Sequence, residues 1–155
     1  MRMNDLDGRD RAILRVLQED GRLTNAELAD KVGLSPSACL RRVRLLEDSG
    51  LVAGYAMILD QKACGLPGTA FVFITLDQQG RQALDAFEDA IRAVPEILEC
   101  YLLAGQSDYL VRVVYRDAAD LERIHTETLT RLPGVVRVNS TLTLRQVKKT
   151  TRLPV

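Results

Sequence analysis

The stretch from Leu34 to Arg44, Leu-Ser-Pro-Ser-Ala-Cys-Leu-Arg-Arg-Val-Arg, decides how the first third of the chain folds. Ser35 is a favourable N-cap because its hydroxyl can accept a hydrogen bond from a free N–H of the first helical turn. Pro36 suits the first helical position, where its missing N–H would have no partner in any case. The sequence therefore predicts a helix that begins after Ser35 and stops at Gly50.

At 100° per residue, this helix has a polar face and an apolar face. The apolar stripe, expected to pack on a core, consists of Cys39, Leu40, Val43 and Leu46. The polar stripe consists of Ser37, Arg41, Arg44 and Asp48, with Arg42 at its flank. Three arginines and no acid thus lie within residues 36–44. A guanidinium group can donate two hydrogen bonds to guanine or pair with phosphate, although a solvated arginine face is the alternative interpretation.

Two further helices are predicted upstream. Asp7 can cap the first of them, over residues 7–20, and Thr24 with Glu27 forms a capping box for a short second helix that ends at Gly33. Two helices separated by a tight, glycine-containing turn are typical of the helix-turn-helix, whose second member enters the major groove. We therefore predict that residues 1–60 form a DNA-binding domain with double-stranded DNA as its partner.

The predicted DNA-binding residues have different roles. Arg41 and Arg44 are expected to touch bases or nearby phosphates, and Ser37 and Arg42 to help fix the DNA backbone. Ser35 and Pro36 set the angle of the helix through its N-terminal cap.

Strand-like alternation follows the helix over residues 51–60, which predicts a hairpin wing. The breakers Gly65, Pro67 and Gly68 then mark residues 61–68 as a linker, and residues 69–155 as a second domain.

The second domain repeats one pattern of strand, helix and strand. Strands are expected at 70–76, after 97, at 109–115 and at 135–144, and helices at 80–93 and 117–131. Pro95 and Pro133 occupy equivalent places in the two halves. The predicted fold class is therefore α+β: a winged helix-turn-helix domain, then a ferredoxin-like βαββαβ domain with its helices on one face of the sheet.

The first strand of that sheet is apolar on both faces. Phe71 and Phe73 lie on one face, and Val72, Ile74 and Leu76 on the other. Because helices can cover only one face, a second copy of the chain is expected to cover the other, which gives a homodimer. A dimer also presents two reading heads to symmetric half-sites on DNA.

Composition limits the possible partners. The chain of 155 residues has 21 basic and 21 acidic side chains, so DNA binding depends on local placement of charge and on the avidity of paired heads. No apolar stretch is long enough to span a membrane, and the first residues lack the apolar core of a signal peptide, which favours a cytoplasmic location.

Cysteine and histidine are too few for most enzyme or metal sites. Cys39, Cys64 and Cys100 fit neither a disulfide framework nor zinc spacing, and we expect reduced, mostly buried thiols. His125 is the only histidine, so no catalytic set is predicted, and neither a metal nor a cofactor is expected. Alternatives that stay open are a catalytic descendant of a related fold, a metal-responsive regulator that uses scattered carboxylates, and an interaction module without DNA function.

The chain resembles the Lrp/AsnC family of transcriptional regulators over nearly its whole length. The likeness is carried by Leu6-Asp7, residues 23–28, Leu34-Ser35-Pro36-Ser37, Cys39, Arg42, Arg44, Leu46-Glu47, Gly50, Gly105, Asp108-Tyr109 and residues 149–155. The resemblance implies dimers that often associate into octamers, and a small ligand, usually an amino acid, that binds in the second domain between subunits.

The resemblance also implies where that ligand binds. The residues expected to bind it are Gly105, Gln106, Ser107, Asp108 and Tyr109 in a loop, and Asn139, Ser140 and Thr141 on the last strand. Ordinary turn chemistry is the alternative explanation for Gly105 and Asp108. Ala104 stands where many family members carry threonine. The overall likeness is nearest to members that control branched-chain amino-acid catabolism or respond to leucine or methionine.

Overall fold

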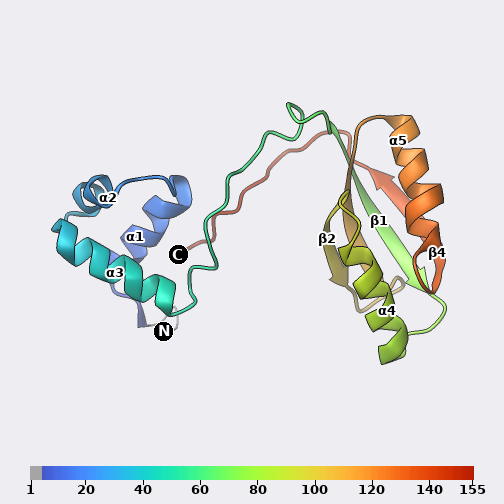
Figure 1. Ribbon diagram of the computed structural model, residues 1–155, viewed down its shortest axis with the longest axis horizontal. Coiled ribbons are helices and arrows are strands. Elements are labelled where there is room, and N and C mark those ends of the chain that lie inside the picture. Colours follow the sequence, from blue (N-terminus) through green and yellow to red (C-terminus); the bar gives the residue numbers. More distant parts are fainter. Residues whose placement is uncertain (1–4) are drawn as a thin grey trace. The chain divides into compact units, whose positions relative to one another are not determined.

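The computed structural model describes residues 5–155, which form two compact units (Figure 1). One unit, the head, holds the described residues up to Met57 together with Lys148–Val155. The other, the sheet domain, spans Ile58–Val147. Among the described residues, no helix is both long and apolar enough to cross a lipid bilayer.

The head contains three helices, α1 (Gly8–Glu19), α2 (Asn25–Val32) and α3 (Pro36–Asp48). Each begins at a side-chain cap that satisfies backbone N–H groups of the first turn. Asp7 caps α1, Thr24 and Glu27 form the capping box of α2, and Ser35 accepts a hydrogen bond from the N–H of Ala38. The three predicted helices and their caps are confirmed.

The core of the head is formed by the inward faces of these helices. Its buried residues are Leu6, Ile13, Leu14, Leu28, Ala29, Val32, Cys39 and Leu46. Leu40 was expected to join them, but it is 38% exposed. At about 100° from Cys39 on the wheel, Leu40 lies at the outer edge of the apolar stripe.

Residues 51–60 form an extended segment without strand pairing, and not the expected hairpin wing. Alternation predicts an extended backbone, but a hairpin also needs a turn and a second strand that pairs with the first. Residues 51–60 supply neither. The hydroxyl of Tyr55 donates a hydrogen bond to Glu47 at 2.9 Å, and its ring lies against Gly21. These contacts hold the start of the segment to the head.

Residues 148–155 pack on α1. The Gln18 side chain pairs with the backbone of Leu153 through two hydrogen bonds of 2.6 and 3.2 Å, and the Nε of Arg15 donates to the backbone oxygen of Val155 at 2.6 Å. Val155 also packs against the core of the head. The sequence assigned this stretch to the second domain, whereas its contacts assign it to the head.

The sheet domain contains four antiparallel strands in the order β2-β3-β1-β4. The strands are β1 (Gly68–Leu76), β2 (Ile97–Leu102), β3 (Tyr109–Tyr115) and β4 (Val135–Leu142). Helix α4 (Arg81–Arg92) joins β1 to β2, and α5 (Ala118–Arg123) continues through a π turn, Ile124–Thr128, and a 3-10 turn, Leu129–Arg131. This arrangement confirms the ferredoxin-like βαββαβ domain.

The two faces of the sheet differ as the alternation in β1 predicts. Val72 and Ile74 are fully buried, under Phe87 of α4 and Leu129 after α5. Phe71 and Phe73 point to the opposite face, where each is 36% exposed. The helices therefore leave an open, partly apolar face of the sheet.

The predicted linker, residues 61–68, is a hydrogen-bonded turn attached to β1. The Gln61 amide donates to backbone oxygens of Leu66 and Gly68, at 2.7 and 3.1 Å, and to the hydroxyl of Thr69 at 3.0 Å. The contacts place this segment in the sheet domain, which begins at Ile58.

Candidate nucleic-acid interface and ligand pocket

The turn between α2 and α3 is held from both sides. Gly33 ends α2 with a φ of 64°, a left-handed conformation that favours glycine, and the Arg9 guanidinium donates to the carbonyl of Val32 beside it. The Asn25 amide donates to the carbonyl of Pro36 at 2.8 Å. The start of α3 is therefore fixed relative to α2.

Two of the three arginines on α3 are free to bind a ligand. Arg41 and Arg44 are exposed, and neither has a hydrogen bond or ion pair with the residues that the structure describes. Ser37 lies on the same face, with its hydroxyl 3.3 Å from that of Ser35. The predicted stripe of Ser37, Arg41 and Arg44 thus forms one exposed face of a capped helix.

Arg42 points elsewhere. Its guanidinium lies 2.7 Å from the carboxylates of both Asp7 and Asp10, at the start of α1. These carboxylates, Asp10 first, raise the pKa of Arg42. The pKa of Asp7 is lowered, first by the backbone N–H of Asp10 and then by Arg42. Arg42 is therefore held within the head, a geometry that differs from the expected contact with the DNA backbone.

The sequence analysis did not find these ion pairs because Asp7 and Asp10 precede Arg42 by 35 and 32 residues. The helical wheel places Arg42 about 100° from Arg41, which was the only available sign that its side chain leaves the polar stripe.

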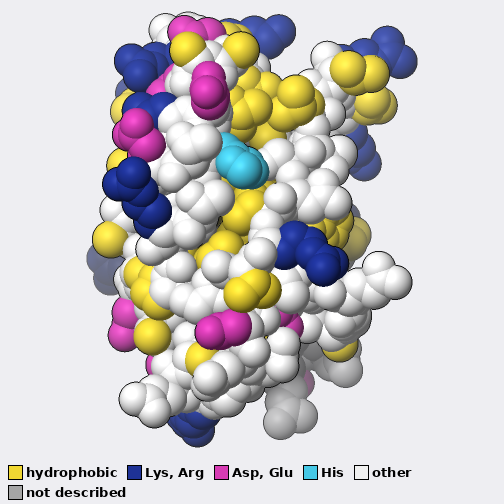
Figure 2. Space-filling view, turned by 90° about the vertical axis from the view of Figure 1, so that its right-hand side faces the viewer, with side chains coloured by type: hydrophobic (Ala, Val, Ile, Leu, Met, Phe, Trp, Pro, Cys, Tyr) yellow, Lys and Arg dark blue, Asp and Glu magenta, His cyan; other side chains and the backbone are white. Residues whose placement is uncertain are grey.

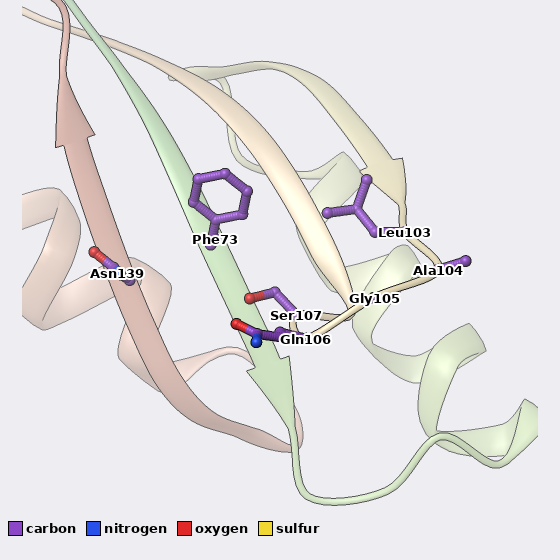
Figure 3. Close-up of a pocket in the computed structure, with 7 residues that line it drawn as sticks. All are labelled: Phe73, Leu103, Ala104, Gly105, Gln106, Ser107 and Asn139. Atoms are coloured by element: carbon purple, nitrogen blue, oxygen red, sulfur yellow. The ribbon is translucent and has the colours of Figure 1, made fainter.

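The sheet domain has an open hollow of about 480 Å³ on its uncovered face (Figure 3). It is lined by Phe73, Leu103, Ala104, Gly105, Gln106, Ser107 and Asn139. Figure 3 shows Phe73 on β1, between Asn139 of β4 and the β2–β3 loop. The structure thus brings together four of the predicted ligand-binding residues: Gly105, Gln106, Ser107 and Asn139.

The sequence analysis missed two lining residues, Phe73 and Leu103, and noted the third, Ala104, only as a departure from the family's threonine. Phe73 is the cross-strand partner of Asn139, so the alternation in β1 together with the sheet register would have found it. Leu103 and Ala104 directly precede the predicted loop residues. They add an apolar side to the hollow.

Asp108 holds the loop in place and does not line the hollow. Its carboxylate accepts a hydrogen bond from the N–H of Leu76 at 2.7 Å, and its own N–H donates to the carbonyl of Ile74 at 2.9 Å. Its carbonyl accepts from the N–H of Leu103 at 2.7 Å. Asp108 therefore anchors its end of the loop to β1 and closes the loop onto Leu103. This role is structural, but the partner of its carboxylate lies on β1 and not within the turn, as ordinary turn chemistry would have it.

The remaining three predicted residues also lie outside the hollow. Tyr109 is 1% exposed, its ring centre is 4.4 Å from that of Phe87, and its hydroxyl donates to Glu88 at 2.9 Å. Ser140 pairs with the buried Val72 and faces the helices, with its hydroxyl buried. Thr141 shares the open face but lies beside Phe71, further along the sheet.

Family models match both units of the chain. The model described as the Lrp/AsnC ligand binding domain matches residues 69–153, and a winged helix-turn-helix DNA-binding model matches residues 6–53. The chain belongs to the Lrp/AsnC family. It is a transcriptional regulator with a DNA-binding and a ligand-binding domain, and not an enzyme.

Relatives of this Lrp/AsnC regulator are similar over most of their length. The leucine-responsive regulatory protein of Escherichia coli is 40% identical over 149 residues, which cover 96% of this chain and 91% of that protein. An uncharacterised helix-turn-helix regulator from Sinorhizobium fredii is 47% identical over 117 residues, covering 76% and 92%.

Two solved structures support the same architecture. A regulator from Neisseria meningitidis in complex with L-methionine has a TM-score of 0.92 and 40% identity, over 96% of each chain. An AsnC family regulator from Agrobacterium tumefaciens has a TM-score of 0.91 and 36% identity, over 96% of this chain and 97% of that one.

The residues considered for metal or redox chemistry are dispersed. Cys39 is buried, but Cys64 and Cys100 are exposed, so the expectation of mostly buried thiols is wrong for two of the three. Within residues 5–155, no three histidine, cysteine, aspartate or glutamate side chains gather as a metal site. His125 lies in the π turn. Figure 2 shows this histidine in cyan, with hydrophobic side chains above and below it.

Proposed function

We propose that this Lrp/AsnC regulator binds duplex DNA through the exposed face of α3. Arg41 and Arg44 contact base edges or nearby phosphates, and Ser37 contacts the backbone. The observation that supports this assignment is the contrast among the three arginines: Arg42 is neutralised by two aspartates, whereas Arg41 and Arg44 are exposed. Exposed guanidinium groups on one face of the second helix of a helix-turn-helix suit the major groove.

The DNA-binding form is a homodimer, and dimers associate further into an octamer. The open face of the sheet supports the dimer, because Phe71 and Phe73 are each 36% exposed, and Tyr101, across β3 from Phe73, is 52% exposed. A second copy buries this apolar surface and places two heads on one duplex. Because the net charge of the protein is zero, long-range attraction to DNA contributes little to affinity. The avidity of two heads on one duplex raises the affinity instead.

The effector is an amino acid with an apolar side chain, such as leucine, another branched-chain amino acid, or methionine. The target genes serve amino-acid metabolism. The hollow offers polar groups of Gln106, Ser107 and Asn139 beside the apolar Phe73 and Leu103. The names of two relatives, a leucine-responsive protein and a regulator complexed with L-methionine, support this class of ligand. Asp108 acts indirectly, by ordering the loop.

Charge reversal at Arg44 tests the DNA interface. Arg44→Glu should weaken binding to a selected duplex at least about thirtyfold at fixed salt, because a bidentate arginine contact contributes about 1–3 kcal/mol and a dimer carries the change twice. Arg81→Glu is the matched control, since Arg81 is 94% exposed on α4 of the other unit. Retained affinity of Arg44→Glu in a mobility-shift titration would overturn the assignment.

The effector is tested by a thermal-shift screen of the twenty amino acids, because a ligand that binds the native state raises its stability. Leucine or methionine should raise the melting temperature of the sheet domain, and aspartate or lysine should not. A response limited to charged amino acids would contradict the proposed class.

A further inference from the structure

Two leucines are exposed on α3 although neither serves the core of the head. Leu40 is 38% exposed and Leu45 is 50% exposed, and neither is among the buried or partly buried residues that form the core of the head. On the helical wheel, Leu40 lies about 40° from Arg44 and about 60° from Ser37. Leu40 is therefore part of the surface that α3 presents with its arginines.

The position of Leu40 along the helix separates it from Leu45. Leu40 is the fifth residue of α3, whereas Leu45 is the tenth of its 13 residues. In helix-turn-helix proteins, side chains from the N-terminal part of the second helix reach the base edges. Leu40 lies in that part, whereas Leu45 follows Arg44, the last of the residues proposed to contact bases.

One feature of the major groove attracts an apolar side chain. The C5-methyl group of thymine projects into the groove, and protein side chains read it by apolar contact. Arginine recognises guanine acceptors or phosphate and gains little from a methyl group. An apolar side chain beside the arginines would therefore add information that the arginines do not supply.

We propose that Leu40 reads the C5-methyl group of a thymine next to a base pair contacted by Arg44. This inference rests on the proposed DNA interface of α3. It makes Leu40 a specificity-determining residue that favours thymine over cytosine at one position of each half-site. The contact buries the part of Leu40 that the free head leaves exposed.

The test removes only the methyl group. The full chain selects a duplex from a random pool, and each thymine is then replaced in turn by uracil. Wild-type protein should lose affinity about fourfold for each contacted thymine, since burial of one methyl-sized group contributes about 0.8 kcal/mol. Leu40→Ala should bind the unmodified duplex about fourfold more weakly than wild type per contact, and should be indifferent to uracil at the same position.

Two further variants keep the test decisive. Leu40→Met retains an apolar side chain and should retain the sensitivity to uracil. This variant keeps the proposal testable if Leu40→Ala does not fold. Leu45→Ala should show the full wild-type sensitivity. Uracil scans that leave wild-type affinity unchanged, or that affect Leu40→Ala as much as wild type, would overturn the proposal.

Failure of this inference is distinguishable from failure of the DNA interface. If Arg44→Glu abolishes binding while uracil has no effect, α3 remains the DNA interface and only the role of Leu40 is wrong. If Arg44→Glu binds normally, the interface itself is wrong.

Discussion

The candidate DNA interface and the candidate ligand pocket are built in different ways. Ser37, Arg41 and Arg44 share one face of a single helix, so their proximity follows from the helical repeat. The pocket combines Phe73 of β1 and Asn139 of β4 with the β2–β3 loop, so its composition depends on the sheet register. The first kind of site can be derived from local sequence, and the second requires the fold.

Strand β4 also shows why three consecutive strand residues are not suited to bind one ligand. Successive side chains of a strand point to opposite faces, so Asn139, Ser140 and Thr141 cannot all face one ligand. The register places Ser140 opposite the buried Val72, on the helix-covered face. Four predictions test this division between binding residues and supporting residues.

The largest effect is expected at Asp108. Asp108→Ala removes the carboxylate that accepts the N–H of Leu76, and it should lower the free energy of unfolding of the sheet domain by about 2 kcal/mol. Urea denaturation followed by a probe in that domain measures the change. Asp108→Asn keeps an acceptor oxygen and should recover much of the stability; an Asp108→Ala protein that is fully stable but has lost effector binding would make Asp108 a direct ligand contact.

Asn139 and Ser140 form a matched pair on adjacent positions of β4. Asn139→Ala should weaken binding of the effector found in the screen about tenfold, because a polar partner of the ligand is lost. Ser140→Ala should leave binding unchanged and stabilise the domain by up to about 1 kcal/mol, since the buried hydroxyl has no partner among the described residues. Calorimetric titration checks both, and loss of binding in Ser140→Ala would reverse the assignment of faces.

Arg42 tests whether every arginine of α3 meets DNA. Arg42→Gln should leave the slope of log affinity against log salt unchanged, because Asp7 and Asp10 already hold its guanidinium. A fall in the slope of about 0.9 for each copy would instead show that Arg42 neutralises a phosphate. Its thermal midpoint should fall slightly, since α3 loses its tie to the start of α1.

These comparisons show what the sequence could predict. The caps at Asp7, Thr24 and Ser35 and the alternation in β1 are local signals, and they yielded the three helices and the ferredoxin-like sheet. Contacts between distant segments were not accessible, because no local pattern reports that residues 148–155 return to α1 or that Asp7 meets Arg42. The hairpin wing failed because alternation over residues 51–60 specifies an extended backbone but not its pairing.

The smallest effect concerns two tyrosines, one in each unit. Burial, followed by the Glu88 carboxylate, raises the pKa of Tyr109 well above its ordinary value of 10. Burial and Glu47 raise the pKa of Tyr55 to about 12, although that side chain is 54% exposed. A tyrosine in the unfolded chain ionises near pH 10, whereas the folded sheet domain keeps the Tyr109 proton.

The unfolded state therefore binds fewer protons than the native state above pH 10, and the stabilisation that Tyr109 provides at neutral pH is lost as the pH rises towards its folded pKa. One such group contributes at most about 1.4 kcal/mol per pH unit. Tyr109→Phe lacks this loss, so its deficit in unfolding free energy relative to wild type should shrink between pH 9 and pH 11. The same comparison for Tyr55→Phe should give a weaker trend, because that residue is about half exposed, whereas Tyr109 is buried. Parallel stability curves for Tyr109→Phe and wild type over this range would mean that Tyr109 ionises freely in the folded domain, against its burial under Phe87.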